Sequence, residues 1–348
     1  MKVGAPDDEG RKEVVRIGHK IKINQIQHKE EETMKHENVV LFDNVGLPSI
    51  MVKFTPEAGK PLDPVFMVCG RRAKAIYISK YENTLVKGVP CSIPFAQAAN
   101  CIDFNAASAL CRGKGDGWHL MTNTEWEYLH NESIEGGTLP HGNTARGRYF
   151  FDESESGEKY DYGHTLTGSG PVTWTHTHTP DGVCDLCGDN WEMVAGLRLR
   201  KGAIEYIKDN DAALADLSPN SEAWQRAKTA AGQDIFLDAT HGGVKVTTEA
   251  PEDGWDGCHF TDLEINLEEV PEILQQLGIV PQNVEEEMAY IFADSGEDET
   301  IPFRGSGFGN TSNGGLGALH LSYARSGVGN DVGFRSAYVE FEELETEN

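Results

Sequence analysis

The sequence has 348 residues, of which 39% are hydrophobic, and a formal net charge of −26 at pH 7. A chain of this length can bury a substantial core, as one large domain or two small ones. Because like charges repel, the net charge argues against a nucleic-acid backbone or an anionic membrane surface as the partner.

The amino-terminal residues and the cysteines predict where the chain is made. Residues 1–9 lack the apolar segment of a signal peptide, and no apolar stretch is long enough to span a membrane. The seven cysteines, an odd number, favour synthesis in a reducing cytoplasm. We therefore expect no membrane insertion. A product that acts outside the cell would leave within a larger particle or by lysis.

The first predicted elements are strands. Residues 1–37 are polar and mixed in charge, and we interpret them as an arm. Val39–Phe42 and Ser49–Phe54 have strand composition and flank a turn-rich segment, so a domain covering residues 38–348 is expected to begin here. Val65–Val68 and Ala75–Tyr81 are predicted as further strands.

Two helices are expected next. Asp103 can cap a helix that ends near Gly113, with Phe104 on its apolar face. Thr122–Glu125 has the capping-box pattern, in which a hydroxyl and a carboxylate each bind a free backbone N–H, and Trp126 would anchor this helix to the core. Short strands, two helices and much irregular structure predict an α+β fold.

Residues 131–173 are rich in turn formers, and residues 200–301 have the character of an insertion. Within the insertion we expect helices over Ser221–Gly232 and Pro271–Gly278. Sixteen acidic residues and no Lys or Arg lie between Val246 and Phe303. Such a run is usually a solvated face, and it could also hold calcium.

The carboxyl-terminal region, residues 304–337, contains a frame of apolar and arginine residues and, between them, residues of mixed type. Leucines, arginines and a predicted closing strand over Val332–Phe341 provide the frame. Between them stand twelve residues with no common size, charge or polarity, which indicates exposure: Gly307, Phe308, Gly309, Asn310, His320, Ser322, Tyr323, Gly327, Val328, Gly329, Asn330 and Asp331.

The genetic code offers a source for this mixture. An Asn codon whose two adenines are replaced at random can become Gly, Ser, His, Tyr, Val, Asp or Phe, but never Lys, Glu, Gln, Met or Trp. Those five residue types are absent from Ser306 to Asp331. The alternative explanation is turn composition, because Gly, Asn and Ser dominate turns for backbone reasons.

The frame resembles the variable region of proteins diversified by diversity-generating retroelements, which are C-type-lectin-fold binders of phages and bacteria. The residues that carry this resemblance are Arg304-Gly305, Ala318-Leu319, Leu321, Ala324–Ser326 and Val332–Ala337. Upstream, His119–Tyr128 and Gly188–Leu197 resemble the two signature blocks of the formylglycine-generating-enzyme (sulfatase-modifying factor) superfamily. The resemblance runs in order from Ile76 to Tyr338, apart from the insertion.

The resemblance implies a C-type-lectin fold of the formylglycine-generating-enzyme subtype. It also implies a receptor-binding function, as on a phage tail, directed at a host-surface protein or glycan, with no cofactor required and a homo-oligomer as one way to gain avidity. The twelve residues would be the variable ligand-binding positions. The scaffold would comprise Arg304, Leu319, Leu321, Arg325, Phe334, Arg335, Trp126 and Trp191.

Three alternatives stay open. An oxidase of this superfamily works through a carboxyl-terminal cysteine pair, whereas this sequence has no cysteine after Cys258 and carries Asn310 and Gly315 near the corresponding positions. We therefore expect no enzyme. A calcium-dependent carbohydrate-binding lectin and a purely structural virion protein are the other two.

Two sets of residues permit both a site and ordinary packing. His176, His178, Cys184 and Cys187 are four zinc-type ligands within a dozen residues, although one Cys-x-x-Cys motif is equally compatible with core packing. Arg304 and Arg335 could bind an anion. We favour the interpretation that their guanidinium groups tie carbonyls and carboxylates together beneath the display surface.

Overall fold

The computed structural model describes residues 36–240, 242–281 and 289–342. The chain divides into two units, residues 1–37 and 38–348. The arm predicted over residues 1–37 lies almost wholly outside the described residues. Sheet predominates, and the described part contains three α-helices, which agrees with the α+β class: α2 (Phe104–Arg112), α3 (Asn123–Gly136) and α4 (Glu272–Gln276).

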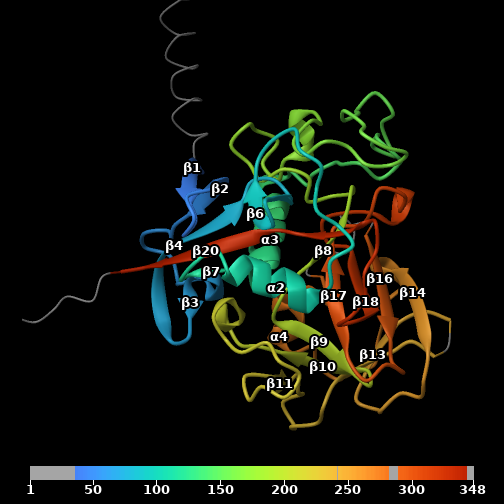
Figure 1. Ribbon diagram of the computed structural model, residues 1–348. Coiled ribbons are helices and arrows are strands. Elements are labelled where there is room, and N and C mark those ends of the chain that lie inside the picture. The colour runs from blue at the N-terminus through green and yellow to red at the C-terminus, as the bar shows by residue number, and fades with distance from the viewer. Residues whose placement is uncertain (1–35, 241, 282–288, 343–348) are drawn as a thin grey trace, which may run out of the picture. The chain divides into compact units, whose positions relative to one another are not determined.

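The first sheet joins the two ends of the domain (Figure 1). Its carboxyl-terminal strand pairs antiparallel with strands from the amino-terminal third of the domain on both sides. The strand order is β1 (Glu37–Phe42), β2 (Pro48–Phe54), β4 (Arg71–Ser79), β20 (Ser336–Phe341) and β7 (Trp118–Leu120), and β3 (Met67–Val68) pairs with β4.

The second sheet contains most of the predicted insertion and most of the carboxyl-terminal frame. Its order is β14 (Trp255–His259), β16 (Tyr290–Asp294), β18 (Leu319–Ala324), β17 (Thr300–Arg304), β9 (Leu197–Arg200), β10 (Ala203–Tyr206), β12 (Phe236–Asp238), β13 (Lys245–Thr247) and β15 (Glu264–Ile265). Off this path, β11 (Gln225–Arg226) pairs with β10, and β8 (Trp191–Met193) pairs with β17 and β19 (Val332–Phe334). A separate hairpin consists of β5 (Asn83–Val86) and β6 (Val89–Ser92).

Local side-chain chemistry explains the helix starts. Asp103 accepts a hydrogen bond from the Ala106 N–H, and α2 ends at Gly113 as predicted. The capping box at Thr122 is also confirmed, because the Thr122 hydroxyl and the Glu125 carboxylate bind each other's backbone N–H groups. These contacts fix the beginning of α3 behind the first sheet (Figure 1).

Three predicted elements are wrong or incomplete. The strand predicted over Val65–Val68 is a 3₁₀ turn, Pro64–Phe66, followed by the two residues of β3. The helix predicted over Ser221–Gly232 is replaced by β11 and turns, since the Ala227 N–H donates to the Ile204 carbonyl and the Ala227 carbonyl accepts from the Ile235 N–H. Sheet pairing therefore overrides a helical apolar pattern. The helix begun by Pro271 is confirmed but stops at Gln276.

The closing strand predicted over Val332–Phe341 is a fourth such element, because the structure divides it into two strands. β19 belongs to the second sheet and β20 to the first, and Arg335 stands at the break. The buried side chain of Arg335 bonds to Glu192 on β8 of the second sheet and to the Ser79 carbonyl on β4 of the first. Arg335 therefore stands where the chain passes from the second sheet to the first.

Candidate functional site

The strand at the centre of the frame presents alternate residues to the core and to the surface. Leu319 and Leu321 on β18 are fully buried, whereas His320 and Ser322 between them are partly exposed. β18 pairs with β16 on one side and β17 on the other, so its backbone is held along both edges. A change of side chain at His320 or Ser322 leaves that pairing intact.

The loop after β17 is held through its backbone. The Phe308 N–H donates to the Asp189 carbonyl at 2.9 Å, and the Phe308 carbonyl accepts from the Arg146 N–H at 2.8 Å. The Thr311 N–H donates to the Thr144 carbonyl at 2.9 Å. Because main-chain groups make these three bonds, they do not depend on the side chains of Phe308 and Thr311, whereas the Gly307 N–H is bound by the Asn310 side chain.

The second loop, residues 325–331, is held in the same way. The Gly329 carbonyl accepts from the Cys101 N–H at 2.9 Å, and the Asp331 carbonyl accepts from the Trp191 N–H at 2.7 Å. The Gly327 N–H closes a turn on the Ala324 carbonyl at 2.7 Å. Both loops therefore meet the conditions for a rigid backbone with replaceable side chains.

Trp191 lies beneath the place where the two loops meet. Its nearly buried indole and the ring of His320 meet at right angles, with centroids 5.2 Å apart. A Cβ on Gly307 would stand 3.3 Å from Trp191 Cδ1 and 3.1 Å from an Asp331 carboxylate oxygen. Positions from the first loop, β18 and the second loop therefore adjoin one another instead of being scattered.

Eleven of the twelve predicted positions are at least partly exposed, and Gly307 is buried. Gly309, Val328 and Asn330 are the most open of them. The prediction of exposure fails only at Gly307, which is covered because Asp331 and Asn310 close over its backbone.

Several of these residues are better packed than the sequence indicates. The Phe308 ring lies against Gly163 and meets the His164 ring edge-on, with centroids 4.5 Å apart. Tyr323 stacks on the buried Phe303 at 4.8 Å. Burial lowers the pKa of His320 to about 4, so this side chain is neutral at physiological pH.

The four glycines of the set are not equivalent. A Cβ on Gly309 would meet no atom closer than 4.0 Å. Cβ atoms on Gly307 and Gly329 would press on the carboxylate of Asp331, which can move, whereas one on Gly327 would stand 2.9 Å from the Ala324 carbonyl. Replacement therefore requires the least adjustment at Gly309 and the most at Gly327.

Arg304 ties the frame to α3 from below. Its fully buried guanidinium donates to Asn123 Oδ1 at 2.8 and 3.0 Å and to the Leu277 carbonyl at 2.6 Å, and it forms an ion pair with Glu127 at 2.9 Å. Burial alone would raise the pKa of Glu127. The charges of Arg304 and His130 outweigh burial and hold this pKa below its ordinary value. Arg304 is thus occupied by groups of the protein itself.

Arg335 performs the same task between the two sheets. Its Nε and Nη2 donate to the Glu192 carboxylate at 2.6 and 2.5 Å, and the Ser79 and Cys184 carbonyls accept at 3.0 and 3.1 Å. Burial, followed by the charges of Glu192 and Asp189, raises the pKa of the nearby Glu82 carboxyl well above its ordinary value.

The other predicted scaffold residues also have internal partners. Arg325 binds both oxygens of Glu299, at 2.7 and 2.8 Å, and covers the ring of Phe104. The Trp126 indole N–H donates to the Leu316 carbonyl at 2.9 Å. Phe334 is fully buried in the cluster that contains Trp191, whereas Trp126 belongs to a different cluster, so the two tryptophans anchor separate parts of the core.

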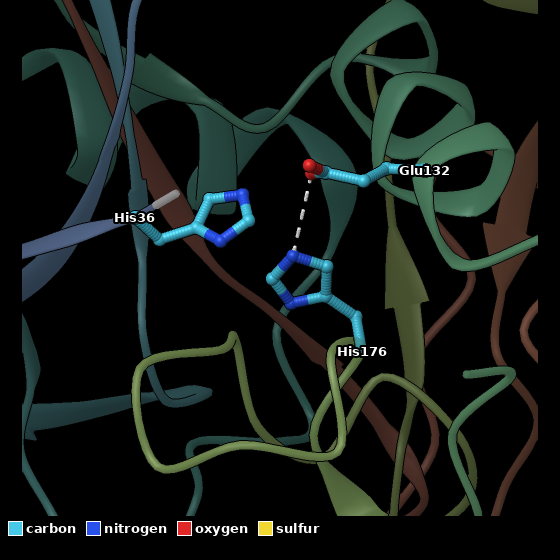
Figure 2. A group of neighbouring side chains, drawn as sticks. All are labelled: His36, Glu132 and His176. Atoms are coloured by element: carbon cyan, nitrogen blue, oxygen red, sulfur yellow. Dashed lines mark ion pairs between the residues drawn. The ribbon is translucent and has the colours of Figure 1, made fainter. Parts of the chain in front are cut away.

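The predicted zinc ligands do not converge. His178 Nε2 is 3.1 Å from the Leu139 carbonyl, His176 Nδ1 accepts from the Val183 N–H, and the Cys184 thiol faces the Gly182 carbonyl. Among the described residues, His178, Cys184 and Cys187 join no group of three His, Cys, Asp or Glu ligand atoms within 4.8 Å. Burial raises the pKa of both thiols to about 12. Figure 2 shows that the Nε2 side of His176 faces the Glu132 carboxylate, 3.6 Å away.

Calcium stays an untested prediction. In the part of residues 246–303 that the structure describes, no three acidic side chains bring ligand oxygens within 4.8 Å of one another. Asn310 and Gly315, which the resemblance places near the oxidase cysteines, lie in the loop between β17 and β18 and offer no thiol. No helix among the described residues is both long and apolar enough to cross a bilayer.

The fold and the site define an α+β protein with two loops and a strand that carry adjoining, mostly exposed side chains on a buried frame. No protein-family model matches the sequence, and no curated protein does. Among solved structures, the chain is similar to a chain described as "Major Tropism Determinant I1 Variant", with 10% identity and a TM-score of 0.35. The match covers 88% of this chain and 56% of that chain.

Proposed function

We propose that this protein binds a target through the surface formed by the twelve variable positions on a C-type-lectin scaffold of the formylglycine-generating-enzyme subtype. In this proposal the positions are diversified by a retroelement, and the target is a host-surface protein or glycan recognised by a phage or prophage product. Tyr323 and Phe308 are the aromatic anchors, because rigid aromatic side chains bury much area at little cost in conformational entropy.

One observation supports this function best. Main-chain hydrogen bonds to Asp189, Arg146 and Cys101 hold the loops that carry the variable positions, while eleven of the twelve positions are at least partly exposed. Such a surface can change its ligand without changing its fold. Several copies on one particle would add avidity, so we also propose a homo-oligomer.

The decisive experiment for diversification is to sequence the DNA beside the gene. We expect a near-copy of the 3′ end of the gene with adenines at the codons of the twelve positions, next to a reverse-transcriptase gene. Sister genomes should differ at those codons and agree at the frame codons. Identical codons at all twelve positions across sister genomes would instead indicate a structural protein of the virion.

A rigid loop backbone also predicts that Gly305 and Gly309 tolerate substitution differently. Gly309→Ser should change the free energy of unfolding by less than about 0.5 kcal/mol, since its surroundings are open. Gly305→Ser should cost about 2 kcal/mol or more, because Gly305 has a φ of +85° and a Cβ there would lie 2.5 Å from the Leu186 carbonyl. Urea unfolding of both variants measures the difference, and equal losses would contradict the frame.

A further inference from the structure

A row of aromatic side chains crosses three strands on the outer face of the second sheet. The rings of Trp255, Phe292 and His320, from β14, β16 and β18, stack in succession with centroid distances of 6.4 and 4.6 Å. Tyr290 adjoins Phe292 at 4.4 Å, and His259 adjoins Tyr290 at 5.0 Å. We call these five residues the aromatic face.

The aromatic face is built into the sheet. A Cβ on Gly257 would lie 2.4 Å from the ring of Tyr290 and 2.7 Å from that of Phe292, so only glycine leaves room for both rings. The Tyr290 hydroxyl donates to the Gly257 carbonyl at 2.8 Å. Alternate residues Ile291 and Ala293 are fully buried, and they fix which side of β16 faces outward.

The aromatic face is continuous with the variable positions. His320 belongs to both, and it also contacts Tyr323 at 5.0 Å and Ser322 through a hydrogen bond of 3.1 Å. At the opposite end the row finishes at Trp255, whose side chain is 60% exposed. Four of its five residues come from the insertion, outside the stretch in which the twelve positions lie.

Carboxylates predominate around this surface, although Lys201 binds the Gly296 carbonyl and Asp298 on the turn after β16. Asp294 is paired directly across from Trp255, and Asp253 lies against Gly296 on the turn that follows β16. The segment 246–303, which supplies β14 and β16, contains sixteen acidic residues and no Lys or Arg. Aromatic rings and carboxylates both attract cations, and the chain as a whole repels anions.

We propose that the aromatic face is the constant half of the binding surface and that it takes an arginine- or lysine-bearing segment of the target protein. This inference rests on the proposed function and names its partner. The cationic group lies over the open face of Trp255 and near Asp294, while the variable positions beyond His320 select among targets that share this feature. The insertion therefore supplies affinity common to all variants, and the loops supply specificity.

The test uses the full chain and two synthetic peptides, one of alternating glycine and arginine and one with citrulline in place of arginine. Citrulline keeps the shape of arginine without its charge. We expect measurable binding of the arginine peptide by calorimetric titration and none of the citrulline peptide. Trp255→Ala should weaken binding by roughly three- to tenfold, and Asp294→Asn by about threefold.

Phe42→Ala is the matched control, since Phe42 is an aromatic residue that is 65% exposed on β1, in the other sheet. It should leave the affinity unchanged. Equal binding of the two peptides, no binding of either, or an unaltered affinity in Trp255→Ala would overturn the proposal. A neutral oligosaccharide such as maltoheptaose that binds in a Trp255-dependent manner would assign the face to glycans instead. Diversified codons found together with any of these results would leave the proposed function standing.

Discussion

Replacing Arg335 by methionine is expected to lower the free energy of unfolding by about 3 to 5 kcal/mol. Methionine fills much of the same volume, so the loss comes from the carboxylate of Glu192, which is 1% exposed and would keep no counter-charge. The carbonyls of Ser79 and Cys184 would also lose donors. Because Arg335 stands between β19 and β20, the variant should loosen the junction of both sheets.

Two further variants separate charge from geometry. Arg335→Lys keeps the charge but not the two parallel bonds to Glu192, and it should fall between the wild type and Arg335→Met. The double variant Glu192→Gln, Arg335→Met should be more stable than Arg335→Met alone, because no uncompensated charge remains buried. Urea unfolding at neutral pH measures all three. A loss below about 1 kcal/mol in Arg335→Met would show that the pair contributes little.

Local chemistry made part of this fold predictable. Asp103 and Thr122 cap their helices through side chains only three residues away, so the sequence is sufficient to place the helix starts. The alternation of Leu319 and Leu321 with His320 and Ser322 likewise indicates a strand with one buried side.

Contacts between distant segments were not predictable in this way. The strand break at Arg335 depends on Glu192, 143 residues away. The segment around Ala227 has a helical apolar pattern but pairs with β10, whose position is set elsewhere in the sheet. Local pattern cannot rank such tertiary pairings against a helix.

The aromatic face was also missed, although a signal was present. Trp255, Gly257 and His259 alternate, as do Tyr290 and Phe292, which is the spacing of side chains on one face of a strand. The acidic composition of the surrounding segment favoured a solvated face or calcium instead. Only the order β14, β16, β18 brings the rings beside His320, and a parallel pairing such as that of β16 and β18 has no local signature.

The buried carboxylates near Arg335 lead to a prediction about pH. Asp185 is buried, and burial together with the charges of Asp189 and Glu192 raises its pKa to about 7, against the effect of the Gly168 N–H and Arg335. A raised pKa means that the folded protein holds this proton more tightly than the unfolded chain does. The resulting stability is complete below the ordinary value of 3.8 and is lost as the pH rises through about 7.

Asp185→Asn should therefore stabilise the protein at about pH 8 by up to about 4 kcal/mol and have little effect at about pH 4. Asparagine suits the position, because Asp185 has a φ of 60° and its carboxylate needs only an acceptor oxygen for the Gly168 N–H. Asp298→Asn is the control, since it removes the same charge from a side chain that is 91% exposed. The measurement is the free energy of unfolding of Asp185→Asn and of the wild type at both pH values. An equal gain in stability at the two pH values, or a loss at the higher one, would show that ionisation of Asp185 does not destabilise the folded protein.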